Sequence, residues 1–536
     1  VGSILYNGQA GLIDLDLNQQ QKVLSAYGYA STQPDYSSFL VAGRPKTGQS
    51  LDEVRDLLLE EVAKLREGDF DEKLIEATIN NYKMQLMRSF EENDSRAILY
   101  VYSFISGADW ADEVARLDRM SKITKQDVVE WANKYLGPES YAIIYKREGK
   151  DPDEQKIAAP KITPIVTNRD SQSEFLSEIQ TSQVQPIEPV FVDYKKDMSQ
   201  FEAQPGIDVL YKKNETNDIF TLIYVFNTGT ENDPALNLAF NYLSYLGTDK
   251  MTAEEIASEM YDIACSFYMN AGANQSSIQI TGLSENMGKA MEIVEGLIAG
   301  AKPDEAILEN LKGDMLKSRA DAKLNQSRCF GALQRYLFYG GDFIRRTTLT
   351  DPALQALTSE QLLAKIGGLM GKQHEVLYYG PQKETEIKSA LAEHHKVAAD
   401  LQPLEKKFSA LLPTDANKVV LAQYDAKQLY YLQFSNRGEK FDVAADPEIT
   451  LYNEYFGGGM NTIVFQEMRE ARGLAYSAWA TLATPSNANG DYSYYAFIAT
   501  QNDKMQKAVE AFDDIINNMP ESEKAFGIAK EALVSR

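Results

Sequence analysis

Residues 455–476 read YFGGGMNTIVFQEMREARGLAY, and the rest of the chain is organised around this stretch. Three glycines, Gly457 to Gly459, open it, where the backbone can turn or pack closely because there is no Cβ. Apolar residues then recur at helical spacing, which predicts an amphipathic helix from Asn461 to Arg472. Gly473 is well placed to end that helix.

Two strands are predicted after the helix, Leu474 to Ala483 and Tyr492 to Thr500, with an Asn-Gly turn between them. Arg469 then lies in the last helical turn and Tyr476 at the start of the hairpin, seven positions apart. A guanidinium and a phenol on such a corner can point at one oxygen. The alternative is a solvated arginine beside a half-buried tyrosine.

This order resembles the M16 metallopeptidases (pitrilysin, insulin-degrading enzyme, mitochondrial processing peptidase). Their repeated core carries a glycine-rich loop and a helix ending in an R-E-x-x-G-L-x-Y-like run. Here the run consists of Arg469, Glu470, Gly473, Leu474 and Tyr476. The resemblance implies that Arg469 and Tyr476 are catalytic and substrate-binding residues, which contact the scissile peptide beside a zinc site in another domain.

Size and composition limit the alternatives. A chain of 536 residues predicts three or four domains, and its net charge of −24 disfavours a nucleic-acid binder. No apolar run approaches the ~18 residues of a membrane span. Cys265 and Cys329 exclude a disulfide scaffold and leave the compartment open. Exported bacterial relatives of the family make the periplasm one expectation.

An internal repeat links the two ends of the chain. Residues 6–30, YNGQAGLIDLDLNQQQKVLSAYGYA, resemble residues 456–480, FGGGMNTIVFQEMREARGLAYSAWA, with a small gap. Each copy leads into a hairpin and then helices, which indicates duplicated domains. About where the second copy has Arg469 and Tyr476, the first has Leu17 and Leu24. A purely structural corner would not need that difference, so the comparison favours a functional pair.

The predicted fold class is α+β, with repeated M16-type domains that each have a mostly antiparallel sheet and helices on one face. In chain order we expect a truncated second domain (1–149) ending in a short strand at Tyr141 to Tyr145, a linker or hinge (150–190), a third domain (191–383), and a truncated fourth domain (384–536). The four prolines of the linker predict that proteases cut there first. The copies differ in where they start and stop, which predicts an internal piece of a longer polypeptide.

Family members bind zinc through H-x-x-E-H on a helix that leads into a Gly-Thr pair. Counting back from Gly247 and Thr248 gives Leu238, Asn241 and Tyr242 at the three positions, and none is a good zinc ligand. The third unit therefore resembles the degenerate domain of the family, and we expect this chain to bind no metal.

The three histidines do not restore a metal site. His394 and His395 are adjacent and point about 100° apart on a helix, and His374 precedes a strand. Three ligands from distant loops would be rare, and a solvated surface position is the expectation for these side chains.

The resemblance thus predicts the non-zinc-binding part of an M16-like zinc metalloendopeptidase, with zinc in a missing N-terminal catalytic domain. This part would form the chamber wall and contribute the Arg/Tyr contacts to a peptide or unfolded-polypeptide substrate. The alternative is a non-catalytic M16-like peptide-binding or scaffold subunit. An intact H-x-x-E-H in the missing domain would support the first reading, and its loss the second.

Overall fold

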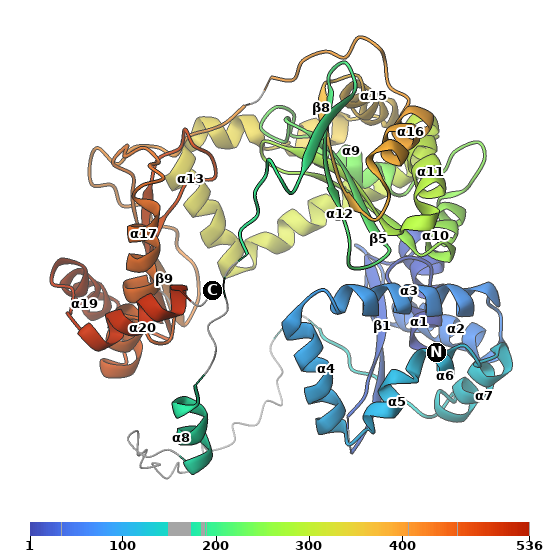
Figure 1. Ribbon diagram of the computed structural model, residues 1–536, viewed down its shortest axis with the longest axis horizontal. Helices are drawn as coiled ribbons and strands as arrows, with labels where there is room; N and C mark the ends of the chain where they lie inside the picture. Colours follow the sequence, from blue (N-terminus) through green and yellow to red (C-terminus); the bar gives the residue numbers. More distant parts are fainter. Residues whose placement is uncertain are drawn as a thin grey trace.

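The computed structural model describes residues 1–33, 35–147, 149, 173–183, 188, 190–405, 407–457 and 459–534. It confirms the α+β class: helices pack against three separate sheets, of two, six and three strands in chain order (Figure 1). The predicted linker, 150–190, lies mostly outside the described residues. No described helix is long and apolar enough to cross a bilayer. The predicted domain boundaries stay a prediction.

The six-stranded sheet is mixed, with strand order β3-β4-β8-β5-β7-β6. Only the β4–β8 pair in this sheet is parallel. Alternate residues of β5, Phe220, Leu222, Tyr224 and Phe226, are all buried on one face, as the two-residue period of a strand requires. The strands are β3 (Ser199–Gln204), β4 (Ile207–Lys213), β5 (Ile219–Phe226), β6 (Cys265–Ala271), β7 (Ser276–Leu283) and β8 (His374–Gly380).

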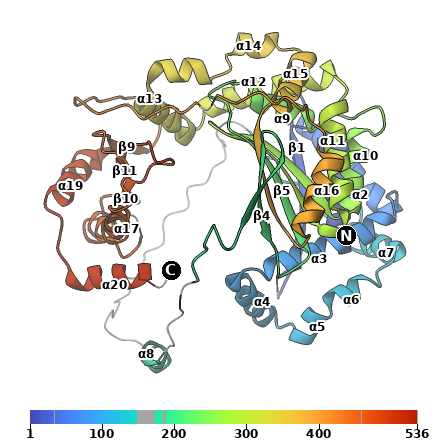
Figure 2. The same cartoon turned by 45° about the horizontal axis from the view of Figure 1, so that its top comes forward.

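Helices cover that face and form the largest core of the molecule with it (Figure 2). Thr252 and Thr358 each begin a helix with a capping box, which satisfies the free N–H groups of the first turn. The helices are α9 (Leu236–Leu243), α10 (Ala253–Asp262), α11 (Met287–Gly300), α15 (Ser359–Met370) and α16 (Glu384–His394).

The N-terminal unit docks against this six-stranded unit. Helix α3 contacts α10 and β5, and Asn81 of α3 donates to the carbonyl of Tyr261 at 2.8 Å. Arg88 reaches Thr281 of β7 at 2.9 Å. The principal elements of the unit are α1 (Gly2–Leu5), η1 (Asp14–Gln19), β1 (Ser25–Ser31), β2 (Ser38–Arg44), α2 (Leu51–Glu67), α3 (Lys73–Ser89), α4 (Asn93–Ser106) and α7 (Lys125–Tyr135).

The C-terminal unit is reached through two long helices, α12 (Glu305–Lys323) and α13 (Gln326–Thr347). Helix α13 bends at Gly340, whose φ of +79° is a conformation that glycine adopts without strain. Phe330 and Phe338 of this helix pack on aromatic rings of the three-stranded sheet. The elements beyond are β9 (Gln428–Ser435), α17 (Asp446–Tyr452), β10 (Ser477–Ala483), β11 (Ser493–Gln501), α19 (Met505–Asn517) and α20 (Glu523–Val534).

One predicted strand is wrong. Tyr141 to Tyr145 has no regular secondary structure. These residues are mostly exposed, and Ile144 is 94% exposed. An isolated apolar segment forms a strand only when a neighbouring strand accepts its backbone hydrogen bonds, and no described strand pairs with this one.

Candidate functional site

The predicted corner is present, but the helix before it differs from the prediction. Instead of one α-helix from 461 to 472, a single α-helical turn, α18 (Ile463–Phe465), passes into the π-helical turn η4 (Gln466–Ala471). Val464 and Met468 are fully buried and fasten the turn to the sheet. Gly473, at φ +56°, ends it. The wider π turn changes which residues share a face, and such turns are frequent at functional sites.

Arg469 and Tyr476 lie together on the solvent side of this corner. The guanidinium carbon is 5.5 Å from the centre of the Tyr476 ring and 4.9 Å from that of Phe465. Tyr476 is 73% exposed, yet its backbone N–H donates to the carbonyl of Ala499 at 3.1 Å, which fixes its position on the sheet. Within the described residues its hydroxyl has no hydrogen-bond partner. Two hydrogen-bond donors are thus held side by side and face outward.

Arg469 makes one weak ionic contact, with its Nε 3.8 Å from the carboxylate of Glu470. Both side chains are more than 40% exposed, so solvent screens this pair. Because the aromatic rings occupy the face of the guanidinium, its N–H edge stays available for a ligand.

The first copy of the repeat has the same backbone at this corner. The π-helical turn η1 (Asp14–Gln19) precedes β1 by the same spacing as η4 precedes β10. When the two turns and strands are aligned by this spacing, Leu17 corresponds to Arg469 and Leu24 to Tyr476. Leu17 is completely buried in the N-terminal core. Leu24 is partly exposed, so the corner is apolar and largely covered in the first copy, and polar and open in the second.

The positions of the zinc motif lie on α9 and do not fit a metal. Leu238 is buried in the core, and Asn241 is exposed. The hydroxyl of Tyr242 bonds to Ser359 at 2.8 Å and accepts from the backbone N–H of Asp304 at 2.7 Å. Tyr242 thus joins three elements of the core. Among the described residues, no group of three His, Cys, Asp or Glu side chains is arranged to hold a metal ion.

The expectation of solvated histidines is wrong for His374 and His395. Both are buried, at 4% and 5% exposure, and their Nε2 atoms are 2.8 Å apart. His395 Nδ1 lies 2.5 Å from a carboxylate oxygen of Glu295 on α11, and its ring lies tilted against that of Tyr224 of β5, with the ring centres 4.2 Å apart. Four segments of the chain build this cluster, β5, α11, β8 and the end of α16, and no local sequence signal predicts that they meet.

Hydrogen-bond chemistry fixes the direction of the bond between the two rings. His374 Nδ1 lies 2.8 Å from the carbonyl of Lys372, which can only accept, so Nδ1 carries the proton. Its Nε2 is then an acceptor, and His395 Nε2 must donate. Burial, the largest cause, and the nearby His395 together lower the pKa of His374 to about 4, although the hydrogen bond to the carbonyl of Lys372 and the charge of Glu295 act in the opposite direction. Burial raises the pKa of Tyr224, as does the charge of Glu295.

Comparisons with known proteins agree with this architecture. Residues 374–533 match the family model described as the peptidase M16 inactive domain. An uncharacterized zinc protease of Streptomyces coelicolor is 23% identical over 266 residues, which cover 46% of this chain and 56% of that protein. An uncharacterized zinc protease of Rickettsia bellii is 23% identical over 296 residues, covering 53% and 68%.

Two solved structures share the fold. The peptidase M16 inactive domain from Pseudomonas fluorescens has a TM-score of 0.51 at 17% identity and covers 63% of this chain and 83% of that one. The periplasmic protease PqqL from Escherichia coli has a TM-score of 0.52 at 13% identity and covers 97% and 61%. These findings confirm the resemblance to the M16 peptidase family. The chain spans little more than half of the Streptomyces relative.

Proposed function

We propose that this chain is the part of an M16-type zinc metallopeptidase that does not bind the zinc. It forms a wall of the substrate chamber and presents Arg469 and Tyr476 to the scissile peptide. The observation that carries the proposal is the exposed pair itself: two donors in contact, fixed to a sheet edge, where the duplicated corner has leucines. The zinc-protease names of the relatives are consistent with it.

The residues of this chain would act on the carbonyl oxygen of the peptide bond. That oxygen gains negative charge when the carbonyl carbon becomes tetrahedral, and hydrogen-bond donors held in place stabilise it. Tyr476 donates one hydrogen bond from its hydroxyl. Arg469 offers two N–H groups in a fixed fork, which can hold the same oxygen or the next carbonyl along the substrate.

The test is turnover of a short peptide by the complete protein. Tyr476→Phe should lower kcat by roughly 10²–10³, as the loss of one oxyanion donor does. Tyr268→Phe, at a 65% exposed tyrosine of β6, is the matched control and should turn over like the wild type. Both variants should keep the wild-type melting temperature, because each loses one exposed hydroxyl. Unchanged kcat in Tyr476→Phe would mean that the pair is structural.

The second candidate is a non-catalytic subunit that binds peptides or acts as a scaffold. It is favoured by the degenerate positions on α9 and by the match to a domain described as inactive. The complete protein, supplied with zinc, would then bind peptides and cleave none. Peptide cleavage that a metal chelator abolishes would exclude this candidate.

A further inference from the structure

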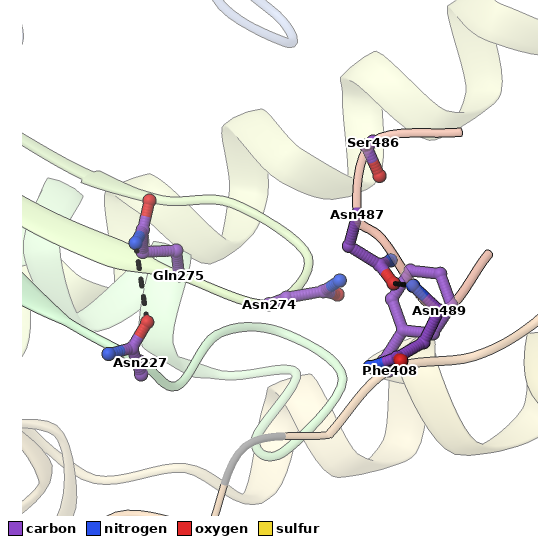
Figure 3. Close-up of a pocket in the computed structure, with 7 residues that line it drawn as sticks. All are labelled: Asn227, Asn274, Gln275, Phe408, Ser486, Asn487 and Asn489. Atoms are coloured by element: carbon purple, nitrogen blue, oxygen red, sulfur yellow. Dashed lines mark hydrogen bonds between the residues drawn. The ribbon is translucent and has the colours of Figure 1, made fainter. Parts of the chain in front are cut away.

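A cavity of about 470 Å³ lies between the hairpin turns of two different sheets (Figure 3). One wall is the β6–β7 turn of the six-stranded sheet, with Asn274 and Gln275. The opposite wall is the β10–β11 turn, which contributes Ser486, Asn487 and Asn489. Asn227 and Phe408 complete the lining. Its volume lies within the roughly 300–1,000 Å³ of ordinary ligand sites.

The lining consists of five carboxamides, one hydroxyl and one phenyl ring, and no charged side chain is among the lining residues. Some of these groups already have partners. Gln275 donates to Asn227 at 3.3 Å, and Asn487 Oδ1 accepts from the backbone N–H of Asn489 at 2.9 Å. These bonds hold each wall in shape, but neither crosses the cavity.

Other polar groups lack partners. The Oδ1 atom of Asn274 is buried and accepts no hydrogen bond. Its side chain points from its turn across the cavity toward Asn487 and Phe408 (Figure 3). Within the described residues, the side chains of Ser486 and Asn489 also make no hydrogen bond. A buried polar atom without a partner is unfavourable, so Asn274 is poised to gain from a ligand that donates to it.

We propose that this cavity binds an extended, uncharged stretch of polypeptide, held by its main chain. A carboxamide carries the same donor and acceptor as a peptide group, so opposed asparagines can pair with successive N–H and C=O groups of a strand. Phe408 offers an apolar surface to one of its side chains. The absence of charge from the lining disfavours an ionic ligand.

This site is distinct from the Arg469/Tyr476 pair. Tyr476 precedes the first residue of β10 and Ser486 follows its last, so the two sites lie at opposite ends of that strand. Seven strand residues separate them by roughly 20 Å. Substitutions in the cavity therefore leave the proposed catalytic pair untouched, and the two proposals can fail independently.

The test uses the 536-residue chain and a fluorescein-labelled octapeptide of alternating alanine and serine, blocked at its far end. Fluorescence anisotropy gives the Kd. The double variant Asn274→Leu/Asn489→Leu keeps side-chain size and removes hydrogen bonds, so its Kd should rise about tenfold or more. Asn237→Leu, at an exposed position of α9, is the matched control and should leave the Kd unchanged.

Hydrogen exchange of the wild-type chain provides a readout that does not depend on the variants folding. Saturating octapeptide should slow exchange in residues 272–276 and 485–490. Maltohexaose serves as a neutral hydrogen-bonding ligand of another class and should protect neither turn. The proposal is overturned if the octapeptide does not bind, if it protects other regions only, if the folded double variant binds as well as wild type, or if only the sugar protects these turns.

Discussion

Lowering the pH from 7 to 5 should weaken the six-stranded sheet around His374. The pKa of this buried side chain is about 4, whereas a histidine in an unfolded chain titrates near ~6.5. Between these two values the unfolded chain binds more protons than the folded chain. The free energy of unfolding therefore decreases as the pH is lowered. The loss begins near pH 6.5 and is complete near pH 4. From the two pKa values, His374 alone accounts for about 2 kcal/mol between pH 7 and 5.

The surroundings of His374 support this sign. The ionisable groups around it are His395 after α16, Glu295 on α11 and Tyr224 on β5. A proton added to His374 Nε2 would face the N–H of His395, so the hydrogen bond between the rings would become a repulsion. Glu295 contacts His395 Nδ1, and it makes no hydrogen bond to His374. The charge of Glu295 favours the protonated form of His374, but burial and His395 oppose that form more strongly.

The assay must report on this sheet alone. The three tryptophans, Trp110, Trp131 and Trp479, lie outside it, so their fluorescence is a poor probe. Hydrogen exchange of a peptide spanning β8, corrected for intrinsic rates, gives the local free energy of opening at each pH. In wild type that energy should fall by about 2 kcal/mol between pH 7 and 5. His374→Gln should remove most of the fall, and His394→Gln, the matched control, should retain it. An equal fall in His374→Gln and wild type would refute the assignment.

Three further predictions concern other positions. The purified 536-residue chain, dialysed without chelator, should contain no stoichiometric zinc by elemental analysis, because Leu238, Asn241 and Tyr242 are not good zinc ligands. One tightly held zinc per chain would contradict this prediction. Tyr242→Phe should cost about 1–3 kcal/mol in urea unfolding followed by circular dichroism, since it leaves Ser359 and the backbone of Asp304 without their partner. Gly229→Ala should lower the free energy of unfolding by about 1–3 kcal/mol in the same assay, because an added Cβ would collide with the carbonyl oxygens of Gly272 and Ala273. The control Gly296→Ala, where the added Cβ meets open space, should be neutral or stabilising.

Much of the fold was predictable from local patterns. The hairpin strands after Gly473 were predicted within three residues of β10 and β11, because alternating burial and an Asn-Gly turn are encoded locally. The corner that carries Arg469 and Tyr476 was also predicted, together with its leucine counterpart in the first copy. Its π-helical turn was not, since apolar spacing does not separate it from an α-helix.

The histidine cluster shows where sequence reasoning stops. His374 lies on the same face of β8 as Val376 and Tyr378, so the two-residue period of the strand is a local signal for its burial. His395 follows the end of a helix and has no such signal. Their contact depends on the pairing of β8 within the sheet and on the packing of α11 and α16 over it. Such long-range contacts appear only when the whole sheet is assembled. The carboxamide cavity is of the same kind, because its two walls come from different sheets.

A double-mutant cycle on kcat tests the central proposal most directly. The complete protein is assayed on a short peptide as wild type, Arg469→Lys, Tyr476→Phe and the double variant. If both side chains hold one developing oxyanion, each single substitution lowers kcat, and their effects do not multiply in the double variant, because residues that act as a unit are non-additive. Wild-type kcat in both single variants, or fully multiplicative losses, would contradict a shared role at the scissile peptide.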